Sequence, residues 1–556
     1  MDAHSRQLQQ NRRRLLALSP RRRIGSILEA RRPAALARVL PAQDFYLTLA
    51  EASPAEARAL LPLASRHQLD FVLDIDAWGR DRFSAGRLAT WLERFAEAGP
   101  ELMARWLREG DEKTVVLALS RVLTVYKLDP SVDESRWPPE PAPRTLDGLY
   151  YLAPVPRLSP KAFEGLLGGL ALLRGAGTRV YEALLEQVLW AIPAEHEEEV
   201  YTERVSRLAE RGFPPLEESL EVWAPSLTAE QLARRLASLA PSPGSPRPAA
   251  STALVPVDSD PLPCLAQALA ACDPSRAEAF IHQGLARLGN RFAVASLAHL
   301  GRPRTHRDGL RLAFCHANLG LELITRGDEA RLGPALDHLS AAEVVGAGTA
   351  AVIERVERAR RLEQGWLRRV HLAGERLDAP IARALAGLLR HRPRFEGWEE
   401  SRPFRAVEDL ERCDELLLAA ESMGTFLEER LGAGARELPE LARLPAGRRN
   451  IEDVEWSAVA LTAIARRVLG GGGDPRPLSA RQAAEALAAL TVDQAGTLRC
   501  TPAFFAAAEQ LGLAPAAPFL AARLEDSAQA ARGQTPPNPD LLRALLLAPP
   551  GEPDLR

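Results

Sequence analysis

Four aspartates close together in the first hundred residues are the side chains best suited to bind a metal ion. They are Asp70, Asp74, Asp76 and Asp81. On a helix Asp70 and Asp74 share one face, and Asp76 lies near the carboxyl end, where the helix dipole disfavours an anion unless a cation binds it. Carboxylate oxygens suit Mg²⁺ or Ca²⁺. The cluster is therefore a candidate divalent-cation site, as in a sensor or a metal-dependent enzyme.

A structural role is the alternative for these aspartates, and it is the one we favour. Their spacing does not match the EF-hand loop. Arg66, Arg80 and Arg82 lie close enough in the sequence to neutralise the carboxylates. Salt bridges and turn capping then account for the cluster, and no cofactor is needed.

Arginines concentrate at the amino end of the chain. They include two triplets, Arg12, Arg13 and Arg14, then Arg21, Arg22 and Arg23. Leucines alternate with them, which is typical of a docking helix with a solvated basic face, of a segment on an anionic membrane surface, or of one that follows phosphates. Aromatic residues that would stack on bases are missing there. We expect a protein partner or an anion here, with peripheral membrane contact as an alternative and nucleic acid as the least favoured partner.

Other motifs that could indicate a chemical function are not supported by the residues around them. The glycines at 470–473 follow a predicted helix, whereas a phosphate-binding loop follows a strand. His299, His306 and His316 lack the spacing of a zinc-binding helix. The acid-rich run 195–199 most simply stabilises a helix start, with binding of the basic arm as the alternative. We therefore do not expect an enzyme.

Composition indicates a cytoplasmic globular protein. The 556 residues carry 70 basic and 73 acidic side chains, and the formal net charge of −3 excludes a surface dominated by one sign. Hydrophobic residues make up 46% and aromatic residues 5%, so leucine and alanine must fill the core. No apolar run reaches the ~20 residues of a membrane span. Five widely spread cysteines without a pairing pattern fit a reducing compartment.

The elements that must position these residues are helices. Apolar residues recur every three or four positions, as between Glu101 and Leu128, where two stripes separate at Gly110 and Asp111 as in a helical hairpin. Typical helix starts, with a capping residue directly before proline, occur at Ser53-Pro54, Ser159-Pro160 and Asp273-Pro274. The predicted fold is all-α: helical hairpins stacked as a superhelix, or solenoid, in the amino-terminal half, followed by a helical carboxyl-terminal half.

Proline-rich and glycine-rich stretches divide the predicted chain. At 136–160 proline favours extended backbone, a connector packed by Trp137, Tyr150 and Tyr151. The stretch 241–263 is the expected main boundary. The predicted parts are a basic arm (1–32), a superhelix-like domain (33–240), a linker (241–263), a helical domain (264–469), a Gly/Pro linker (470–478), a small helical cap (479–532) and a partly disordered tail (533–556).

Several segments look like an uncharacterised bacterial protein family of unknown function. They are LPAQDFYLTLAEASPAEARALLPLASRHQLDFVLDIDAWGRDRF from Leu40, EEEVYTERVSRLAERGFPPLEESLEVW from Glu197, HANLGLEL from His316 and LDAPIARALAGLLRHRPRFEGW from Leu377. The resemblance covers most of the chain and implies a helical bacterial cytoplasmic protein, without an activity or site residues. The hairpin pattern of the first hundred residues also resembles the superhelical N-terminal domains of magnesium transporters and the related flagellar switch protein. That analogy would favour a cation-responsive surface at 70–81.

The function favoured by these observations is that of a non-enzymatic interaction protein, an adaptor or regulatory scaffold. A curved helical surface in residues 30–240 would bind another protein, because stacked helical units form extended concave surfaces. One alternative is a cation sensor or metal-dependent enzyme that uses the aspartates at 70–81. Another is binding of nucleic acid or an anionic membrane through the basic arm.

Overall fold

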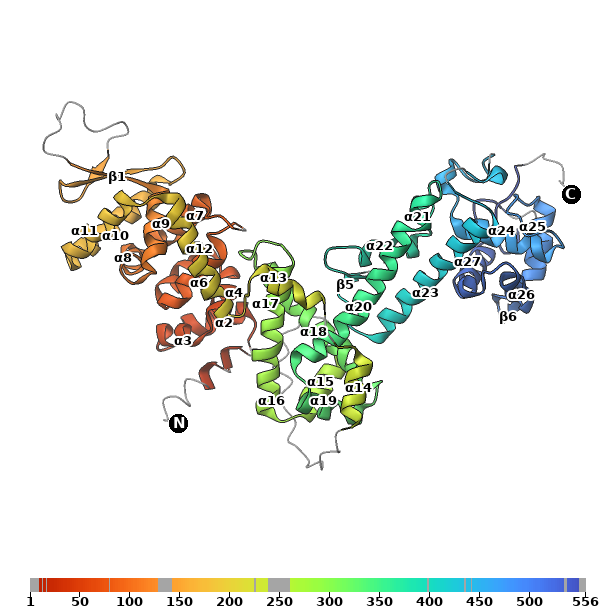
Figure 1. Ribbon diagram of the computed structural model, residues 1–556, viewed down its shortest axis with the longest axis horizontal. Coiled ribbons are helices and arrows are strands. Elements are labelled where there is room, and N and C mark those ends of the chain that lie inside the picture. Colours follow the sequence, from red (N-terminus) through yellow and green to blue (C-terminus); the bar gives the residue numbers. More distant parts are fainter. Residues whose placement is uncertain are drawn as a thin grey trace. The chain divides into compact units, whose positions relative to one another are not determined.

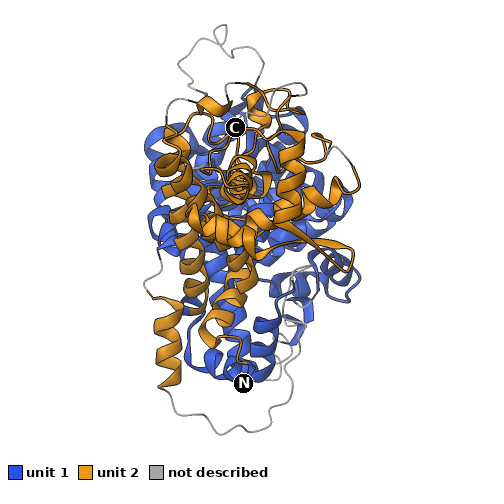
Figure 2. Cartoon of the chain, turned by 90° about the vertical axis from the view of Figure 1, so that its right-hand side faces the viewer, with its two compact units in different colours: residues 1–224, 239–314, 329–343 blue, residues 225–238, 315–328, 344–556 orange. Residues whose placement is uncertain are grey.

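The computed structural model describes residues 10–12, 14–16, 18–79, 81–128, 143–224, 227–238, 261–397, 400–434, 437–441, 443–534 and 538–549. The chain folds into two compact units, which Figure 2 colours separately. Unit 1 comprises residues 1–224, 239–314 and 329–343, and unit 2 comprises residues 225–238, 315–328 and 344–556. Helices dominate the described part of both units and strands are short, which confirms the predicted all-α class.

The first part of unit 1 consists of short helices and one small sheet (Figure 1). The helices are α2 (Pro20–Leu28), α3 (Pro33–Val39), α4 (Ala42–Ala50), α5 (Pro54–Leu60), α6 (Arg66–Asp76), α7 (Ala85–Ala98), α8 (Pro100–Glu109), α9 (Glu112–Val122), α10 (Pro160–Ala176), α11 (Thr178–Trp190), α12 (Pro193–Glu210) and α13 (Leu216–Leu220), with the 3-10 turns η1 (Leu61–Leu63) and η3 (Glu221–Trp223). The second part of unit 1 contains α15 (Pro263–Ala271), α16 (Pro274–Ala279), the π-helix η5 (Phe280–Leu285), α17 (Ala286–Ala295), the start of α18 (Pro303–Thr325), η6 (Glu329–Arg331), α19 (Leu332–His338) and the start of α20 (Ala341–Gln364).

The predicted helix starts are confirmed. Ser53 caps α5, Ser159 caps α10 and Asp273 caps α16, each accepting a hydrogen bond from a backbone N–H of the first turn. Proline occupies the first helical position in all three, where it removes an N–H that would have no partner inside the helix.

The predicted hairpin between Glu101 and Leu128 forms, but its second helix ends earlier than expected. α8 and α9 flank Gly110 and Asp111, and the chain then becomes strand β1 (Leu123–Lys127). β1 pairs antiparallel with β3 (Tyr150–Pro154), and β3 pairs with β2 (Arg144–Thr145). The sequence LTVYK of β1 is rich in the β-branched and aromatic residues that favour strands. The expected connector at 136–160 thus ends in a sheet that includes Tyr150 and Tyr151, while Trp137 lies outside the described residues.

Glycines allow α10 to lie directly on α7 and α8. A Cβ atom on Gly165 would lie 2.2 Å from Ala96 Cβ of α7, and one on Gly169 would lie 2.5 Å from Met103 Cγ of α8. The backbones therefore approach more closely than any side chain at these positions would permit. The same region supplies the leucine-rich core of unit 1, including Leu92, which is fully buried.

Packing across the proline-rich stretch joins helices on both sides of it within unit 1. Residues 239–260 lie outside the described part of the chain, but α13, which precedes them, packs on α17, which follows them. Trp223 and Phe292 contact edge to face, with ring centroids 5.1 Å apart, and Arg291 donates a hydrogen bond to the carbonyl oxygen of Glu218 at 2.6 Å. Composition indicates where a chain cannot form a core. It does not indicate whether the flanking helices pack on each other.

Unit 2 contains helices and two small hairpins. Its elements are α14 (Ala229–Ala237), the remainder of α18 and of α20, α21 (Trp366–Arg369), α22 (Ala379–Leu388), β4 (Phe395–Glu396), β5 (Ser401–Arg402), α23 (Val407–Thr425), the π-helix η7 (Phe426–Arg430), η8 (Pro439–Leu441), η9 (Ile451–Asp453), α24 (Trp456–Val468), α25 (Ala480–Leu490), β6 (Thr491–Gln494), β7 (Thr497–Cys500), α26 (Pro502–Gln510), η10 (Ala514–Ala516) and α27 (Ala517–Ala530).

Helix α24 lies at the centre of unit 2. Every residue from Trp456 to Arg466 is buried, and α23, α25, α26 and α27 pack around the helix. The expected small cap at 479–532 therefore shares one core with the preceding helices. Residues 538–549, which were expected to belong to a partly disordered tail, also join this core: Leu542 and Leu546 are fully buried. The apolar sequence LLRALLLA explains this packing.

Candidate functional site

Asp74 is the most deeply buried aspartate of the predicted cation cluster. Its side chain is 1% exposed, and Arg207 of α12 donates hydrogen bonds to both carboxylate oxygens, at 3.0 and 2.8 Å. Arg204 donates to the backbone carbonyl of Asp74 at 2.6 Å, and the guanidinium of Arg211 lies 3.8 Å from the carboxylate. A buried carboxylate held in this bidentate manner links α6 to α12. Its charge is neutralised by arginine.

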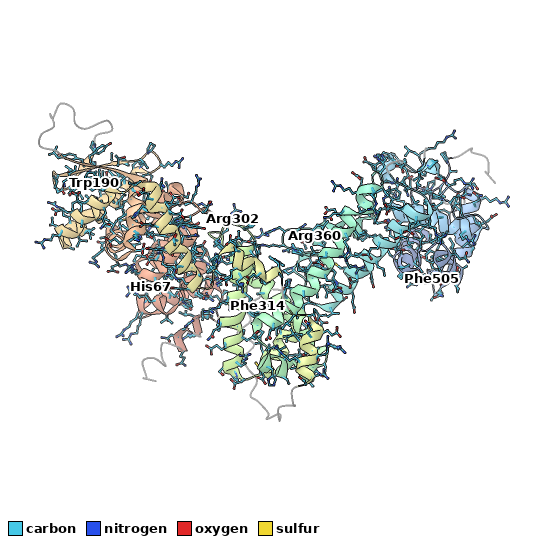
Figure 3. The ribbon with its side chains drawn as sticks, in the orientation of Figure 1. His67, Trp190, Arg302, Phe314, Arg360 and Phe505 are labelled. Atoms are coloured by element: carbon cyan, nitrogen blue, oxygen red, sulfur yellow. The ribbon has the colours of Figure 1, made fainter. Side chains whose placement is uncertain are left out.

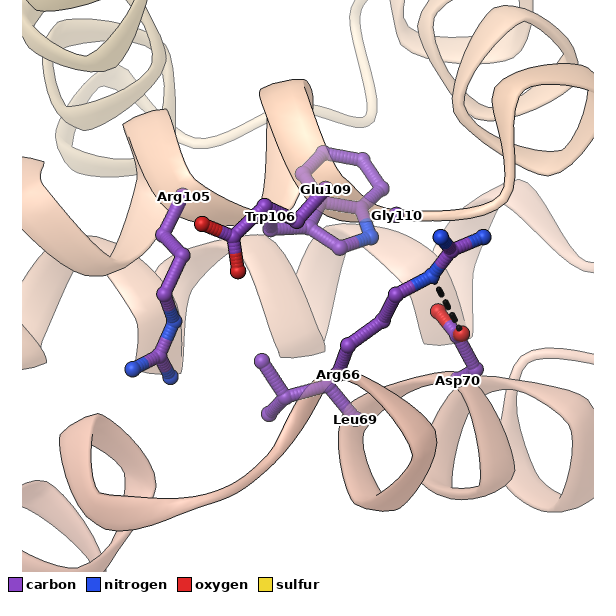
Figure 4. A pocket seen from close by; sticks show the side chains of 7 residues that line it. All are labelled: Arg66, Leu69, Asp70, Arg105, Trp106, Glu109 and Gly110. Atoms are coloured by element: carbon purple, nitrogen blue, oxygen red, sulfur yellow. Dashed lines mark hydrogen bonds and ion pairs between the residues drawn. The ribbon is translucent and has the colours of Figure 1, made fainter.

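Asp70 borders a small hollow between α6 and α8 (Figure 4). Arg66 Nε lies 3.4 Å from Asp70 Oδ2, and burial raises the pKa of the Asp70 carboxyl. Arg105 and Glu109 also line the hollow, whose volume of about 10 Å³ has room for little more than one water molecule. A ligand larger than water does not fit there.

The two remaining aspartates of the cluster lie apart from this hollow. Trp91 Nε1 donates a hydrogen bond to Asp76 Oδ2 at 2.8 Å, whereas Asp81 is exposed in the loop between α6 and α7. Within the described ranges of the chain, no three carboxylates, histidines or cysteines gather closely enough to hold a metal ion. No three of the four predicted ligands therefore meet, and Asp70, Asp74 and Asp76 each contact an arginine or a tryptophan.

The histidines at 299 and 306 attach the segment after α17 to the first helices of unit 1. His299 Nε2 lies 2.8 Å from the carbonyl oxygen of Trp78, and His306 Nε2 lies 2.6 Å from that of Leu300. His306 packs against the ring of Tyr46, and burial lowers its pKa to about 4. A neutral imidazole in this environment serves packing.

The acid-rich run at the start of α12 pairs with basic residues of α9. Glu197 forms an ion pair with Arg121 and accepts a hydrogen bond from the backbone N–H of Phe83 at 2.9 Å. Lys113 lies 3.3 Å from Glu199. These carboxylates therefore contact α9 and the loop before α7, and the hypothesis that they bind the basic arm is not needed to explain them.

Arg23 anchors the basic arm to the rest of unit 1. Its side chain is 6% exposed; Nε donates to the carbonyl oxygens of Leu15 and Leu18, both at 3.0 Å, and Nη2 donates to that of Leu16 at 3.2 Å. Nη1 lies 2.8 Å from Asp44 of α4. One guanidinium thus satisfies three carbonyl groups at the end of the helical turn formed by residues 10–12 and 14–16, which we call the arm turn.

The other arginines of the arm differ in their environments. Arg21 forms an ion pair with Glu56 at 2.6 Å, and Arg22, on the same helix, is exposed. Arg12 and Arg14 are exposed on the arm turn, and Arg13 lies outside the described residues. These arginines are alike in the sequence. Only their burial and contacts distinguish those that hold the arm in place from those that face solvent.

A hollow of about 1050 Å³ opens beside the arm turn. The arm turn, the carboxyl end of α2, and α3 form its walls, and we call it the basic hollow. Its charged and apolar lining residues include Arg14, Arg31, Arg32, Glu29, Leu15, Leu18 and Leu36. Three arginines against one glutamate make it electropositive, and the leucines give it an apolar wall.

The arginines of the basic hollow were predictable from the sequence, but the hollow itself was not. The predicted arm ended at residue 32, whereas α3 supplies Leu36 from beyond that boundary. Pro33 at the start of α3, directly after Arg31 and Arg32, was the available signal for a second helix folded back beside the first. The distance between Leu15 and Leu36 in the sequence hid their proximity.

An exposed tryptophan marks a different surface of unit 1. Trp190, labelled in Figure 3, ends α11. It is 76% exposed, and the nearby Ile192 is 58% exposed. Trp190 Nε1 donates a hydrogen bond to Glu186 at 3.0 Å. Single exposed hydrophobic residues are common on globular proteins. These two side chains alone do not define a binding site.

Unit 2 contains a buried charged cluster that the sequence did not reveal. Asp378, whose side chain is fully buried, accepts hydrogen bonds from Ser457 Oγ at 2.5 Å and from Ser457 N at 3.2 Å, and Arg523 Nε lies 3.2 Å away. Burial raises the pKa of Asp378 to about 6, and the charge of Glu455 adds to the shift. Arg376, also fully buried, stacks on Trp456 at 3.7 Å from the ring centroid. The cluster joins α22, α24 and α27, which indicates a structural junction.

Fold and surface together define a mostly helical protein of two units with a basic, leucine-lined hollow in unit 1. The chain belongs to a family of unknown function, DUF6178, whose model matches residues 2–548. No curated protein and no solved structure matches the chain. The resemblance to an uncharacterised family is thereby confirmed, and the pattern similarity to magnesium transporters is not shown. In the described part of the chain, no helix is both long and apolar enough to cross a membrane.

Proposed function

We propose that the protein is a non-enzymatic binding protein whose basic hollow takes up an acidic, amphipathic helical segment of another protein. The observation that carries this proposal is the combination of three exposed arginines, Arg14, Arg31 and Arg32, with a leucine-lined wall in one hollow. Amphipathic helices bind in such grooves through their apolar face. Carboxylates on the flanking positions would then meet the arginines and fix the orientation of the helix.

The size of the basic hollow favours a macromolecular segment over a small molecule. Its volume of about 1050 Å³ lies at the upper limit of small-molecule pockets, which are roughly 300–1,000 Å³. The hollow is open at the surface, and its lining comes from three consecutive helical segments. A helix laid along these segments would contact both the leucines and the arginines.

The shape of the basic hollow favours a protein over a membrane or a nucleic acid. Membrane-binding surfaces insert projecting apolar side chains into the lipid. Here Leu18 and Leu36 are half-buried, so they line the hollow without projecting from it. The lining contains no aromatic ring on which a base would stack. These features support the interaction role expected from the sequence, with a partner of defined charge.

Charge reversal in the basic hollow tests this proposal. The probe is a fluorescent synthetic amphipathic helix with leucines on one face and glutamates on the flanking positions. We expect the Arg31→Glu/Arg32→Glu variant to bind it at least about tenfold more weakly than the wild type, a loss of ~1.4 kcal/mol. Binding should also weaken as salt screens the charges.

Arg22→Glu is the control, because Arg22 is exposed on α2, close to Arg31 and Arg32 in the sequence, but does not line the basic hollow. It should bind the probe nearly as well as the wild type in fluorescence anisotropy, apart from a small loss from the changed net charge. Equal loss in both variants would attribute binding to general charge and would contradict a specific site. Failure of the wild type to bind the probe would also reject the proposal.

A further inference from the structure

A second hollow lies on the other side of the arm turn. Its volume is about 320 Å³. Residues of the arm turn and of the helical run that contains η5 line it: Arg12, Leu16, Ser275, Glu278, Ala279, His282 and Gln283. We call it the small pocket. A volume near 300 Å³ is at the lower end of the range for small-molecule sites, and five of the seven lining residues have polar side chains.

A π-helix forms one wall of the small pocket. α16, η5 and α17 follow one another without a break, and η5 contributes His282 and Gln283 to the lining. A π-turn interrupts the regular hydrogen bonds of a helix and is frequent at functional sites. Gly284 of η5 approaches α20 closely, because a Cβ at this position would lie 2.4 Å from Ala341 Cβ. The wall is therefore held in place by packing behind it.

The lining has the chemistry to recognise an anion that also carries a hydrogen-bond donor. A guanidinium such as that of Arg12 suits carboxylate or phosphate oxygens, and the amide of Gln283 offers further donors. The carboxylate of Glu278 repels a simple anion but accepts from a hydroxyl or ammonium group. Ser275 Oγ donates to Asp273 at 2.5 Å, and its oxygen still has acceptor capacity.

The arm turn separates the two hollows. Arg12 and Leu16 line the small pocket, whereas Arg14 and Leu15 line the basic hollow. A ligand bound to Arg12 would restrain the arm turn, which is also a wall of the basic hollow. Ordering this wall before the partner binds would reduce the entropy lost in partner binding.

We propose that the small pocket binds a small organic anion with a hydroxyl or ammonium donor, and that its occupancy strengthens partner binding in the basic hollow. The effect on partner binding rests on the proposed function, whereas the anion site does not. The ligand class includes hydroxy acids, amino acids and phosphates of polyols.

Calorimetric titration of the full chain tests the site itself. The probes are L-malate, L-aspartate and glycerol 3-phosphate, with sulfate as an anion without a donor. We expect saturable binding of at least one organic anion at millimolar concentration or below, and at least tenfold weaker binding of sulfate. Absence of binding by all three organic anions would overturn the site, and so would equally tight binding of sulfate.

Two variants place the binding in the small pocket. Arg12→Ala and Gln283→Ala change exposed side chains, so both should fold like the wild type, and each should weaken anion binding at least fivefold. Arg22→Ala, a matched exposed arginine outside the pocket, should leave it unchanged. Wild-type affinity in both pocket variants would contradict the assignment.

Peptide binding with and without the anion then tests the coupling. We expect the anion that binds most tightly to raise the affinity of the acidic helical peptide at least threefold, and Arg12→Ala to abolish that increase. If the peptide binds equally with and without the anion, the coupling is wrong and the anion site stands. If the peptide does not bind under either condition, the proposed function fails, and the titration still decides the anion site.

Discussion

Arginine serves two different purposes in this chain, and its environment distinguishes them. Arg23, Arg207 and Arg376 are at most 21% exposed and bind carbonyl or carboxylate oxygens. Arg31 and Arg32 face solvent at the edge of a hollow. A planar guanidinium suits both tasks, because it forms several hydrogen bonds in fixed directions and keeps its charge when buried. The number of arginines in a segment therefore does not locate a binding site.

Arg23→Ala should release the arm turn. The substitution leaves three carbonyl oxygens and Asp44 without the guanidinium, at a cost of about 2 kcal/mol. Limited proteolysis with thermolysin should cleave the chain between residues 10 and 19 at least about tenfold faster than in the wild type, as expected from that free energy. Arg22→Ala, at an exposed neighbouring position, should not change the rate. Equal rates for Arg23→Ala and the wild type would mean that the guanidinium does not hold the arm.

Asp378→Asn should change the pH dependence of stability. The pKa of Asp378 is raised from 3.8 to about 6, so between these values the folded state holds a proton that the unfolded state releases. Its contribution to stability is complete below 3.8 and is lost as pH rises through 6. Relative to the variant, the wild type should lose up to about 3 kcal/mol between pH 4 and pH 7. Urea unfolding of both proteins across this range measures the difference, and parallel pH profiles would count against the assignment.

Close packing of helices depends on glycine in α10. Gly165 and Gly169 lie where α7 and α8 cross α10, and each would place a Cβ atom within 2.5 Å of a neighbouring side chain. Gly175, on the same helix, is exposed and has nothing within 4 Å of the position of a Cβ. The same residue type thus has a packing role at two positions and a helix-weakening effect at the third.

Gly165→Ala and Gly175→Ala should therefore have opposite effects. The first forces α10 away from Ala96 and should destabilise unit 1 by about 2 kcal/mol. The second should stabilise it by roughly 0.5–1 kcal/mol, because alanine favours the helix. Thermal unfolding of the two variants should show a lowered and a slightly raised Tm. A neutral Gly165→Ala would refute the close crossing.

Elements defined by local chemistry were predictable, and those defined by distant contacts were not. Ser53 and Ser159 cap helices as expected, since a capping side chain and the following proline act within one turn. The three-stranded sheet was missed because β1 pairs with Tyr150 and its neighbours across residues whose prolines suggested an open connector. Asp378 and Ser457 meet across 79 positions, and no pattern in the sequence links them.

At the scale of the whole molecule, the chain forms two units with separate cores, and unit 1 includes residues on both sides of the predicted linker at 241–263. The chain changes units at 224/225 and 238/239, the second close to the predicted boundary, and again within α18 and α20, where helical periodicity continues and gives no sign of a boundary. Stacking of the amino-terminal hairpins as a superhelix remains a prediction. The interaction role proposed for the protein depends on unit 1 alone, because the described walls of the basic hollow come from residues 11–36.

Reversing the charges of the basic hollow and of its peptide is the most direct test of whether the hollow binds an acidic helix. The Arg31→Glu/Arg32→Glu variant is titrated with the acidic helical peptide and with a second peptide whose glutamates are replaced by lysine. Because the leucine wall is unchanged, we expect the lysine peptide to bind the variant at least about tenfold, or ~1.4 kcal/mol, more tightly than it binds the wild type, with the reverse order for the acidic peptide. If the wild type and the variant bind the two peptides in the same order of affinity, binding in the basic hollow is contradicted.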